Sequence, residues 1–297
     1  MPLVQPRHQR WRLVLAHAFL LLLCAAVLLP FLVVLSVSLR PGNFAATGSL
    51  WPAEISFEHW RYVLGLPVPG PDGTPVMPDL PVLRWLWNSV KVALASALVT
   101  LLLSTTAAYA LARMRFAGKR QMLTALMLMQ MFPAVLALVA LYAIFDRLGA
   151  AFPAIGLNTH AALVLAYSGG IAAHVWTIKG YYEILPAEIE EAARVDGASG
   201  WQAFRLVLLP MAVPILVVVF LLAFIGAVIE YPVASVLLTQ QDQLTLAVGS
   251  KLFVQEHNFR WGDFAAAALL SGAPITAVFL LAQRWMLSGL AAGGVKG

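Results

Sequence analysis

The chain has 297 residues, of which 61% are hydrophobic and 11% charged, with a formal net charge of +5 and a mean hydropathy of +0.83. Because a globular domain ordinarily carries about 25% charged residues, this composition excludes a soluble enzyme, a secreted disulfide scaffold and a disordered chain. Charge-free runs long enough to cross a bilayer recur along the sequence, which predicts an all-α integral membrane protein. The single cysteine, Cys24, lies in the first apolar run and cannot form an intramolecular disulfide.

Six windows are long and apolar enough to be transmembrane helices, since a helix needs about 20 apolar residues to cross about 30 Å of hydrocarbon. In chain order they are Leu13–Leu39, Val92–Ala112, Gln121–Phe145, Leu148–Ile178, Leu206–Ile229 and Phe264–Gln283. The fourth window exceeds one span, and Pro153, Gly156 and Asn158 predict that its first part is a loop. The first window is too long for the apolar region of a signal peptide and is followed by Arg40-Pro41, so we expect no cleavable signal.

Lysine and arginine predict the orientation of these spans, because cytoplasmic loops carry an excess of both. With the N-terminus inside, the inner segments hold more Lys and Arg than the outer segments. The loop 113–120 is the most decisive, since it carries four cations and no acidic residue. Both termini are therefore expected in the cytoplasm, with residues 1–12 before the first span (13–39) and residues 285–297 after the last.

The two long extracytoplasmic loops in this topology differ in character. Loop 40–85 carries six prolines within fifteen positions: Pro67, Pro69, Pro71, Pro75, Pro78 and Pro81. Each proline removes a backbone donor and fixes φ, so we expect an ordered cap without regular helix in this stretch. Loop 230–263 exceeds the ~12–15 residues above which a loop is usually functional or disordered. The other five spans and their loops form a predicted core at 86–284.

Segment 183–210 is the most informative stretch, because a predicted cytoplasmic loop should be basic and this one is acidic. It contains five of the fourteen acidic residues of the chain: Glu183, Glu188, Glu190, Glu191 and Asp196. Local signals predict two helices joined by a turn. Pro186 suits a first helical position, and Gly197 suits the left-handed residue after a helix. Ser199 and Gln202 stand at the spacing of a capping box for the second helix.

Two interpretations of this hairpin are open on its periodicity. Glu190 and Arg194 stand at i, i+4 in the favourable order for an ion pair, and Trp201, Phe204 and Leu208 form an apolar stripe at helical spacing. An amphipathic hairpin of this kind can lie on lipid headgroups, or its narrow turn can enter the cleft of a protein partner. Acidic side chains disfavour an anionic membrane surface, which favours the protein partner.

The residues of this segment resemble the EAA signature of ABC importer permeases. The signature reads EAA, three residues, G, nine residues, an aliphatic residue and x-L-P, and it is matched here by Glu191-Ala192-Ala193, Gly197, Val207 and Leu209-Pro210. Longer stretches are similar to the smaller permease subunit of maltose/maltodextrin importers. They are Trp85–Ala93, Leu111–Phe116, Gln130–Gly149, His174–Glu183, Trp261–Ala268 and Gly293–Gly297. The match is looser over about the first 80 residues and at Lys251–Asn258.

The resemblance implies a type I ABC importer permease fold with six spans in the bacterial cytoplasmic (inner) membrane. It also implies an ATP-driven, binding-protein-dependent importer of maltose/maltodextrin-type sugars, in which the partners are a larger permease, two ATP-binding subunits, an extracytoplasmic sugar-binding protein and the lipid bilayer, and no nucleic acid. The chain lacks a P-loop, because Gly118-Lys119 has no glycine at the required upstream spacing. We therefore expect ATP and Mg²⁺ on the partner ATPases, and neither catalytic residues nor cofactor nor metal on this chain.

The resemblance assigns three groups of residues to contacts with partners. The hairpin is expected to couple to an ATPase through Glu190, Glu191, Ala192, Ala193, Asp196 and Gly197. The outer loop is expected to face the binding protein through Gln255, His257, Asn258 and Trp261, which either displace the sugar or only dock the partner. The C-terminal tail is expected to reach between the ATPases, with Lys296 near their nucleotide-sensing surface.

Two other function classes, and several single residues, need separate consideration in this sequence. An ion-coupled secondary transporter would need intramembrane acids or histidines and an internal repeat, and the spans are nearly free of acids. A membrane-embedded enzyme would need polar groups converging at one depth. Glu230 is an ionisable residue near membrane depth, which makes it a functional candidate, although a solvated or paired interfacial position also fits. His17 and His174 lack a second ligand at helical spacing, and Pro133 predicts a kink in the third span.

Overall fold

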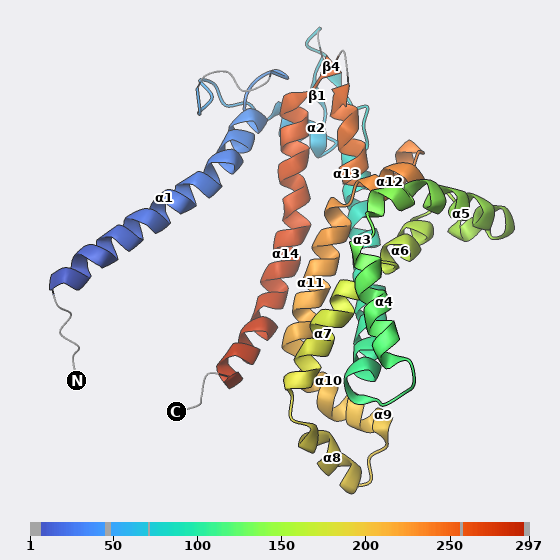
Figure 1. The fold of residues 1–297 in the computed structure, drawn as a ribbon. Coiled ribbons are helices and arrows are strands. Elements are labelled where there is room, and N and C mark those ends of the chain that lie inside the picture. Colours follow the sequence, from blue (N-terminus) through green and yellow to red (C-terminus); the bar gives the residue numbers. More distant parts are fainter. Residues whose placement is uncertain (1–6, 45–48, 71, 256–257, 294–297) are drawn as a thin grey trace. The chain divides into compact units, whose positions relative to one another are not determined.

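The computed structural model describes residues 7–44, 49–70, 72–255 and 258–293 (Figure 1). The chain is mostly helical and divides into two compact units. The first unit comprises Met1–Pro81 with Ser250–Leu270, and the second comprises Val82–Gly249 with Ser271–Gly297. Helix α14 (Trp261–Gly293) begins in the first unit and continues into the second.

The first unit combines one long apolar helix with short elements from both ends of the sequence. Its elements are α1 (Arg7–Ser38), α2 (Glu58–Val63), β1 (Val68–Pro69), β2 (Pro75–Val76), η5 (Ser250–Phe253), β3 (Val254–Gln255), β4 (Asn258–Phe259) and the start of α14. Strands β1 and β2 pair antiparallel, as do β3 and β4. The described residues of the proline-rich stretch thus include a short antiparallel strand pair, and α2 is a short helix that precedes the prolines. From Trp11 to Leu32 the side chains of α1 are exposed within this unit.

The second unit is a helical bundle. Its elements in chain order are α3 (Val82–Arg113), α4 (Lys119–Met131), η1 (Ala134–Ala137), α5 (Leu138–Ala151), η2 (Pro153–Ile155), α6 (His160–Ser168), α7 (Ala172–Ile184), α8 (Ala187–Val195), α9 (Gly200–Ala203), the π-helical turn η3 (Phe204–Leu208), α10 (Leu209–Met211), α11 (Val213–Ile229), α12 (Pro232–Leu237), η4 (Gln241–Gln243) and α13 (Leu246–Gly249).

Helix α3 lies at the centre of the bundle and contacts α6, α7, α11 and α13 (Figure 1). Near one end its small residues Ala93 and Ala97 pack against Phe224 of α11, and small residues allow helix backbones in a membrane to approach closely. Near the other end Tyr109 and Leu111 join a buried cluster with residues of α7, η3 and α11. The bundle is therefore built around one helix that touches most of its neighbours.

Within the described residues, three helices are long and apolar enough to cross a membrane, or up to six if each of three bent pairs is one span. The straight candidates are Trp11–Ser38, Val82–Arg113 and Trp261–Met286. Helix α3 begins ten residues before the apolar window that predicted it. Its first turns carry Arg84, Asn88 and Lys91, and a count of charge-free residues cannot include them.

The described residues of the second unit contain three pairs of helices that are bent at a short break. Two of these bends fall within the apolar windows 121–145 and 148–178. Helices α4 and α5 meet at 89° beside Pro133, which confirms the kink predicted there. Helices α6 and α7 meet at 51° at Gly169-Gly170, and the loop predicted around Pro153 and Asn158 precedes α6. The segment Gly200–Met211 and α11 meet at 76°.

Candidate functional site

The predicted hairpin is formed by α8, α9 and the turn between them, and is called the α8–α9 hairpin below. Gly197 has a φ of 90°, in the left-handed region expected at the end of a helix. The amide of Ala198 donates to the carbonyl of Ala193 at 3.0 Å, which closes the turn. Ser199 and Gln202 form the predicted capping box, with both of its hydrogen bonds present. The left-handed glycine and the capping box are thus confirmed, whereas Pro186 is the N-cap residue of α8 and not its first helical residue.

One side of the hairpin offers an acidic and apolar surface. Glu191, Ala192, Asp196 and Gly197 are exposed and Ala193 is half-buried. Apolar side chains accompany them, because Val195 is 87% exposed and Trp201 is 62% exposed. Exposed apolar side chains beside polar ones mark surfaces that bind partners. In Figure 1 the hairpin lies at the same end of the second unit as the connection between α3 and α4.

Glu190 differs from the other predicted contact residues, because it is 4% exposed and points into the chain. Its Oε1 lies 2.7 Å from Nε of Arg113, the last residue of α3, and the Tyr109 hydroxyl donates to its Oε2 at 3.3 Å. The expectation that Glu190 pairs with Arg194 within α8 was therefore wrong. The fold brings the guanidinium of Arg113 on α3 to the carboxylate, and among the described residues no ion pair within α8 forms beside it.

The outer-loop residues lie on and beside the β3–β4 hairpin. Gln255 is exposed at the end of β3 and pairs in register with Asn258, the first residue of β4. Trp261 is the first residue of α14, and its ring stacks on Phe259 with centroids 5.9 Å apart and planes at 7°. His257 and Lys296 lie outside the described residues. The three described loop positions, Gln255, Asn258 and Trp261, are thus divided between two paired strands and the start of a helix.

A charged network in the first unit was not anticipated from the sequence. Arg260 donates to Asp263 at 2.8 Å and to Asp79 at 3.1 Å, while its guanidinium lies 4.1 Å from the ring centroid of Tyr62. The Tyr62 hydroxyl donates to Asp79. Burial, together with the Asp79 carboxylate, raises the pKa of Tyr62 to about 12, so this hydroxyl stays protonated. The network joins loop 40–81 to the segment that precedes α14.

His59 sits at the buried end of the same network. Its Nδ1 lies 2.7 Å from Oδ1 of Asp263 and its Nε2 lies 3.1 Å from the carbonyl of Gly42. Both partners are acceptors, and this arrangement favours the protonated ring, in which both nitrogens donate. Burial alone would lower the pKa of His59, but Asp263, Glu58 and the Gly42 carbonyl raise it above its usual 6.5. Gly262 lies directly against the His59 ring.

Glu230 is paired rather than free. Its Oε2 accepts from the Tyr167 hydroxyl at 2.7 Å and from the amide of Ala234 at 2.9 Å, and its Oε1 accepts from the amide of Val233 at 2.7 Å. A carboxylate that accepts from the first amides of a helix stabilises the helix N-terminus. Glu230 therefore caps α12, as the paired interpretation of this residue expected.

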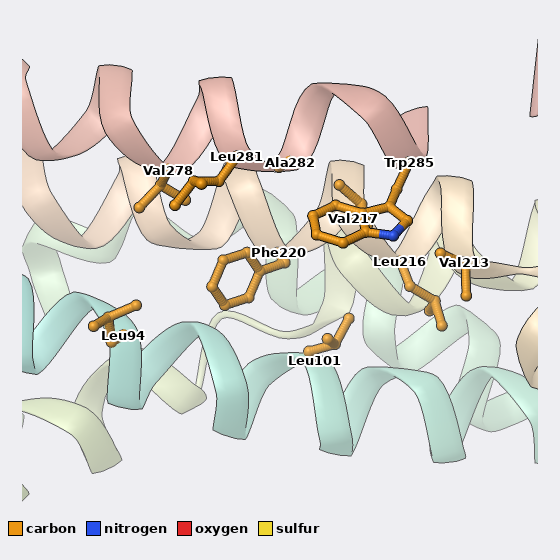
Figure 2. A pocket seen from close by; sticks show the side chains of 10 residues that line it. All are labelled: Leu94, Leu101, Val213, Leu216, Val217, Phe220, Val278, Leu281, Ala282 and Trp285. Atoms are coloured by element: carbon orange, nitrogen blue, oxygen red, sulfur yellow. The ribbon is translucent and has the colours of Figure 1, made fainter. Parts of the chain in front are cut away.

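The second unit contains an apolar groove of about 430 Å³ between α3, α11 and α14. Figure 2 shows Phe220 of α11 and Trp285 of α14 with their rings in the groove, opposite Leu94 and Leu101 of α3. All the lining side chains are apolar or aromatic. A sugar site needs placed polar groups, so this groove does not suit a sugar. Across the described ranges, no three His, Cys, Asp or Glu side chains are grouped to hold a metal ion.

These features define a membrane permease: a bundle with helices long and apolar enough to cross a membrane, and an exposed EAA hairpin held on its central helix. Residues 74–290 match the family described as "Binding-protein-dependent transport system inner membrane component", and the chain belongs to this family.

The chain is also similar over its whole length to individual permease proteins of named transport systems. The chain is similar to the maltose/maltodextrin transport system permease protein MalG of Photorhabdus laumondii, with 59% identity over 297 residues. It is also similar to MalG of Salmonella typhimurium and of Escherichia coli strain K12, at 60% and 59% identity. Each comparison covers 100% of both chains.

Two solved structures share the fold. One is a bacterial ABC transporter involved in the import of the acidic polysaccharide alginate, with a TM-score of 0.74 and 21% identity over 94% of this chain and 98% of that chain. The other is the inward-facing MetNI methionine ABC transporter, with a TM-score of 0.57 and 16% identity over 70% of this chain and 95% of that chain. At these identities the likeness concerns the fold alone.

Proposed function

We propose that this chain is the permease subunit of an ATP-driven, binding-protein-dependent importer of maltose/maltodextrin-type oligosaccharides, and that it forms half of the translocation pathway. The observation that carries the proposal is the exposed, capped α8–α9 hairpin with the complete EAA spacing, held on the central helix of the bundle. The sugar class is supported by 59–60% identity to MalG proteins over the whole chain.

In the proposed topology each bent pair is one span, which gives six, and both termini are cytoplasmic in the inner membrane. The α8–α9 hairpin and the basic loop 113–120 lie at one end of the second unit (Figure 1). This agrees with the excess of cations expected in cytoplasmic loops. Helices α6 and α7 would cross as one span bent at Gly169-Gly170, and α4 and α5 as another bent beside Pro133.

The exposed face of the hairpin is proposed to bind an ATPase subunit. Glu191, Ala192, Asp196 and Gly197 with Val195 would enter its cleft, while Glu190 would hold the hairpin on α3. Two such ATPases would bind ATP and Mg²⁺, one against this chain and one against a second, larger permease. Closure of the ATPases would then displace both hairpins and alternate the side to which the pathway is open. The tail with Lys296 would reach between the ATPases.

The β3–β4 hairpin of the first unit is proposed to face the extracytoplasmic sugar-binding protein. Gln255, His257 and Asn258 would contact that protein near its sugar, and Trp261 would support the hairpin by stacking on Phe259. The charged network around Arg260 supports this assignment, because it fixes the segment that carries the hairpin. Most of the selectivity for sugar would rest with the larger permease and the binding protein.

Uptake into proteoliposomes tests this function against a transporter that works without ATP. The chain, the larger permease, the ATPase and the binding protein from the same source are reconstituted together. Uptake of labelled maltotriose is expected with ATP inside the vesicles and absent with ADP or without the ATPase. Uptake that follows a proton or sodium gradient in vesicles lacking the ATPase would instead establish a secondary transporter.

A further inference from the structure

Helix α3 differs from the other candidate spans in its continuity. Its 32 residues include neither proline nor glycine, and it has no break. Among the described residues, every other candidate span contains a proline or is bent. Helix α1 contains Pro30 and α14 contains Pro274. The three remaining candidates are bent by 89°, 51° and 76°. An unbroken helix keeps all its internal hydrogen bonds, whereas bends at proline or glycine pairs are points where a helix yields.

The inner end of α3 is joined to the α8–α9 hairpin by several buried contacts. Arg113 pairs with Glu190 at 2.7 Å, and its guanidinium also donates to the carbonyl of Leu185, just past the end of α7, at 2.7 Å. One turn earlier, the Tyr109 hydroxyl lies 3.3 Å from Glu190, and its ring packs on Phe204 with centroids 4.4 Å apart. Glu190 is the buried residue of α8, so this helix is attached to the bundle through the carboxylate.

The outer end of α3 is joined in the same way to the segment after α12. The indole of Trp85 donates to the carbonyl of Gln241 at 2.7 Å, and the amide of Asn88 donates to the carbonyls of Asp242 and Leu244 at 2.9 and 3.0 Å. Ser89 accepts from the amide of Leu246 at 2.8 Å. Because these bonds run to the backbone of 241–246, they fix the course of that segment on α3.

We infer that α3 transmits the displacement of the α8–α9 hairpin to segment 241–246 as one rigid body, and that Arg113 and Glu190 are the positioning residues that join the hairpin to it. The inference rests on the proposed function. A helix of this length spans about 48 Å at 1.5 Å per residue, enough to cross the bilayer. A buried ion pair resists separation, since parting the charges leaves each one uncompensated. A displacement of α8 is therefore expected to move α3 while the ion pair between Arg113 and Glu190 stays intact.

The experiment measures the sugar transported per ATP hydrolysed by the reconstituted complex, together with the yield of assembled complex. Glu190→Gln and Arg113→Gln are compared with the parent protein. A positioning role predicts that the ratio of sugar to ATP falls by about threefold or more while assembled complex is still recovered. A purely structural role predicts that transport and hydrolysis fall together with the yield, so that the ratio does not change. That result would overturn the inference.

A second pair of variants tests the rigidity of α3 away from the buried contacts. Leu98 and Leu102 are exposed on one face of α3, at 58% and 66%. Leu98→Gly with Leu102→Gly introduces flexibility, whereas Leu98→Ala with Leu102→Ala removes nearly the same side-chain atoms and keeps the helix stiff. The glycine pair is expected to lower the sugar-to-ATP ratio about threefold relative to the alanine pair. Equal ratios would overturn the inference, even if Glu190→Gln does not assemble.

Failure of the inference is distinguishable from failure of the proposed function. If the parent complex shows no ATP-dependent uptake, the proposed function fails and no ratio exists to compare. If the parent complex transports sugar and all variants keep its ratio, the function stands and the role assigned to α3 is wrong.

Discussion

Arg113 and Glu190 form an ion pair at 2.7 Å with side chains that are 14% and 5% exposed, and this pair joins the central helix of the bundle to the first helix of the EAA hairpin. The sequence predicted Glu190 as one of the acidic contacts for a partner. In the structure Glu190 instead attaches the hairpin to the bundle. The other members of the motif, from Glu191 to Gly197, remain available to a partner. The hairpin thus has an inner face bound to the permease and an outer face of acidic and apolar side chains.

Removing one member of this pair is expected to destabilise the protein. Glu190→Ala leaves the Arg113 guanidinium uncompensated in a nearly buried position, and such losses cost about 3 kcal/mol or more. The matched control is Glu191→Ala, the adjacent exposed glutamate, for which a change within about 0.5 kcal/mol is expected. The temperature at which the detergent-solubilised protein loses its monodisperse form measures both. Equal temperatures for the two variants would show that the pair contributes nothing to stability.

Gly262 and Gly272 both lie on α14, and substitution by alanine is expected to affect protein stability in opposite directions at the two positions. A methyl group at Gly262 would meet the His59 ring, whereas nothing lies within 4 Å of a Cβ at Gly272. Overpacking of this kind costs about 1–3 kcal/mol, so Gly262→Ala is expected to displace His59 from Asp263. Gly272→Ala is expected to be neutral or stabilising, since alanine favours helix. Limited proteolysis within loop 40–81 measures the effect, and faster cleavage in Gly272→Ala than in Gly262→Ala would contradict the prediction.

The His59 imidazolium predicts that the first unit loosens at alkaline pH. Because the folded-state pKa of His59 is raised above its usual 6.5, its contribution is complete below about pH 6.5 and is lost as the pH rises through the folded value. Thermal stability is therefore expected to fall as the pH rises above about 6.5 and through the folded pKa of His59. In His59→Gln this particular fall should be absent, because the amide does not titrate. An identical fall in both proteins would assign it to other groups.

Cysteine labelling tests the side of the membrane on which the α8–α9 hairpin lies. Val195 is 87% exposed in the chain alone, so the labelling uses cells that lack the ATPase and carry Cys24→Ser. In these cells Val195→Cys is expected to react with an impermeant maleimide in inside-out vesicles and not in intact right-side-out cells. Ala203→Cys, at a fully buried position of the same hairpin, is the control and should react in neither. Labelling of Val195→Cys in intact cells would contradict the proposed topology.

The features that the sequence predicted correctly have local signals. The capping box at Ser199, the left-handed Gly197 and the kink beside Pro133 depend on residues within a turn or two of each other, and each is confirmed. The charged networks depend on distant residues. Tyr109 and Glu190 are 81 positions apart, and His59 and Asp263 are 204 positions apart. Periodicity and motif spacing describe only neighbouring residues, so they cannot predict either contact.

The start of α3 was misplaced for a related reason. A window of charge-free residues locates the part of a helix that crosses the hydrocarbon. Helix α3 begins ten residues before that window, at Val82. Trp85, Asn88 and Ser89 in that extension bind the backbone of 241–246. Polar residues that satisfy a neighbouring loop look, in sequence, like residues of a loop. Hydropathy therefore could not predict the first ten residues of α3, which join this helix to segment 241–246.

The affinity of the purified ATPase for this chain, measured in detergent, tests the central claim most directly. Glu191→Arg reverses the charge of the exposed EAA glutamate and is expected to weaken binding by about tenfold or more. Glu54→Arg makes the same charge change at an exposed position of loop 40–85 and is expected to leave the affinity unchanged. Equal affinities of the parent protein and Glu191→Arg, or no binding by the parent protein, would contradict the assignment of the α8–α9 hairpin as the ATPase contact.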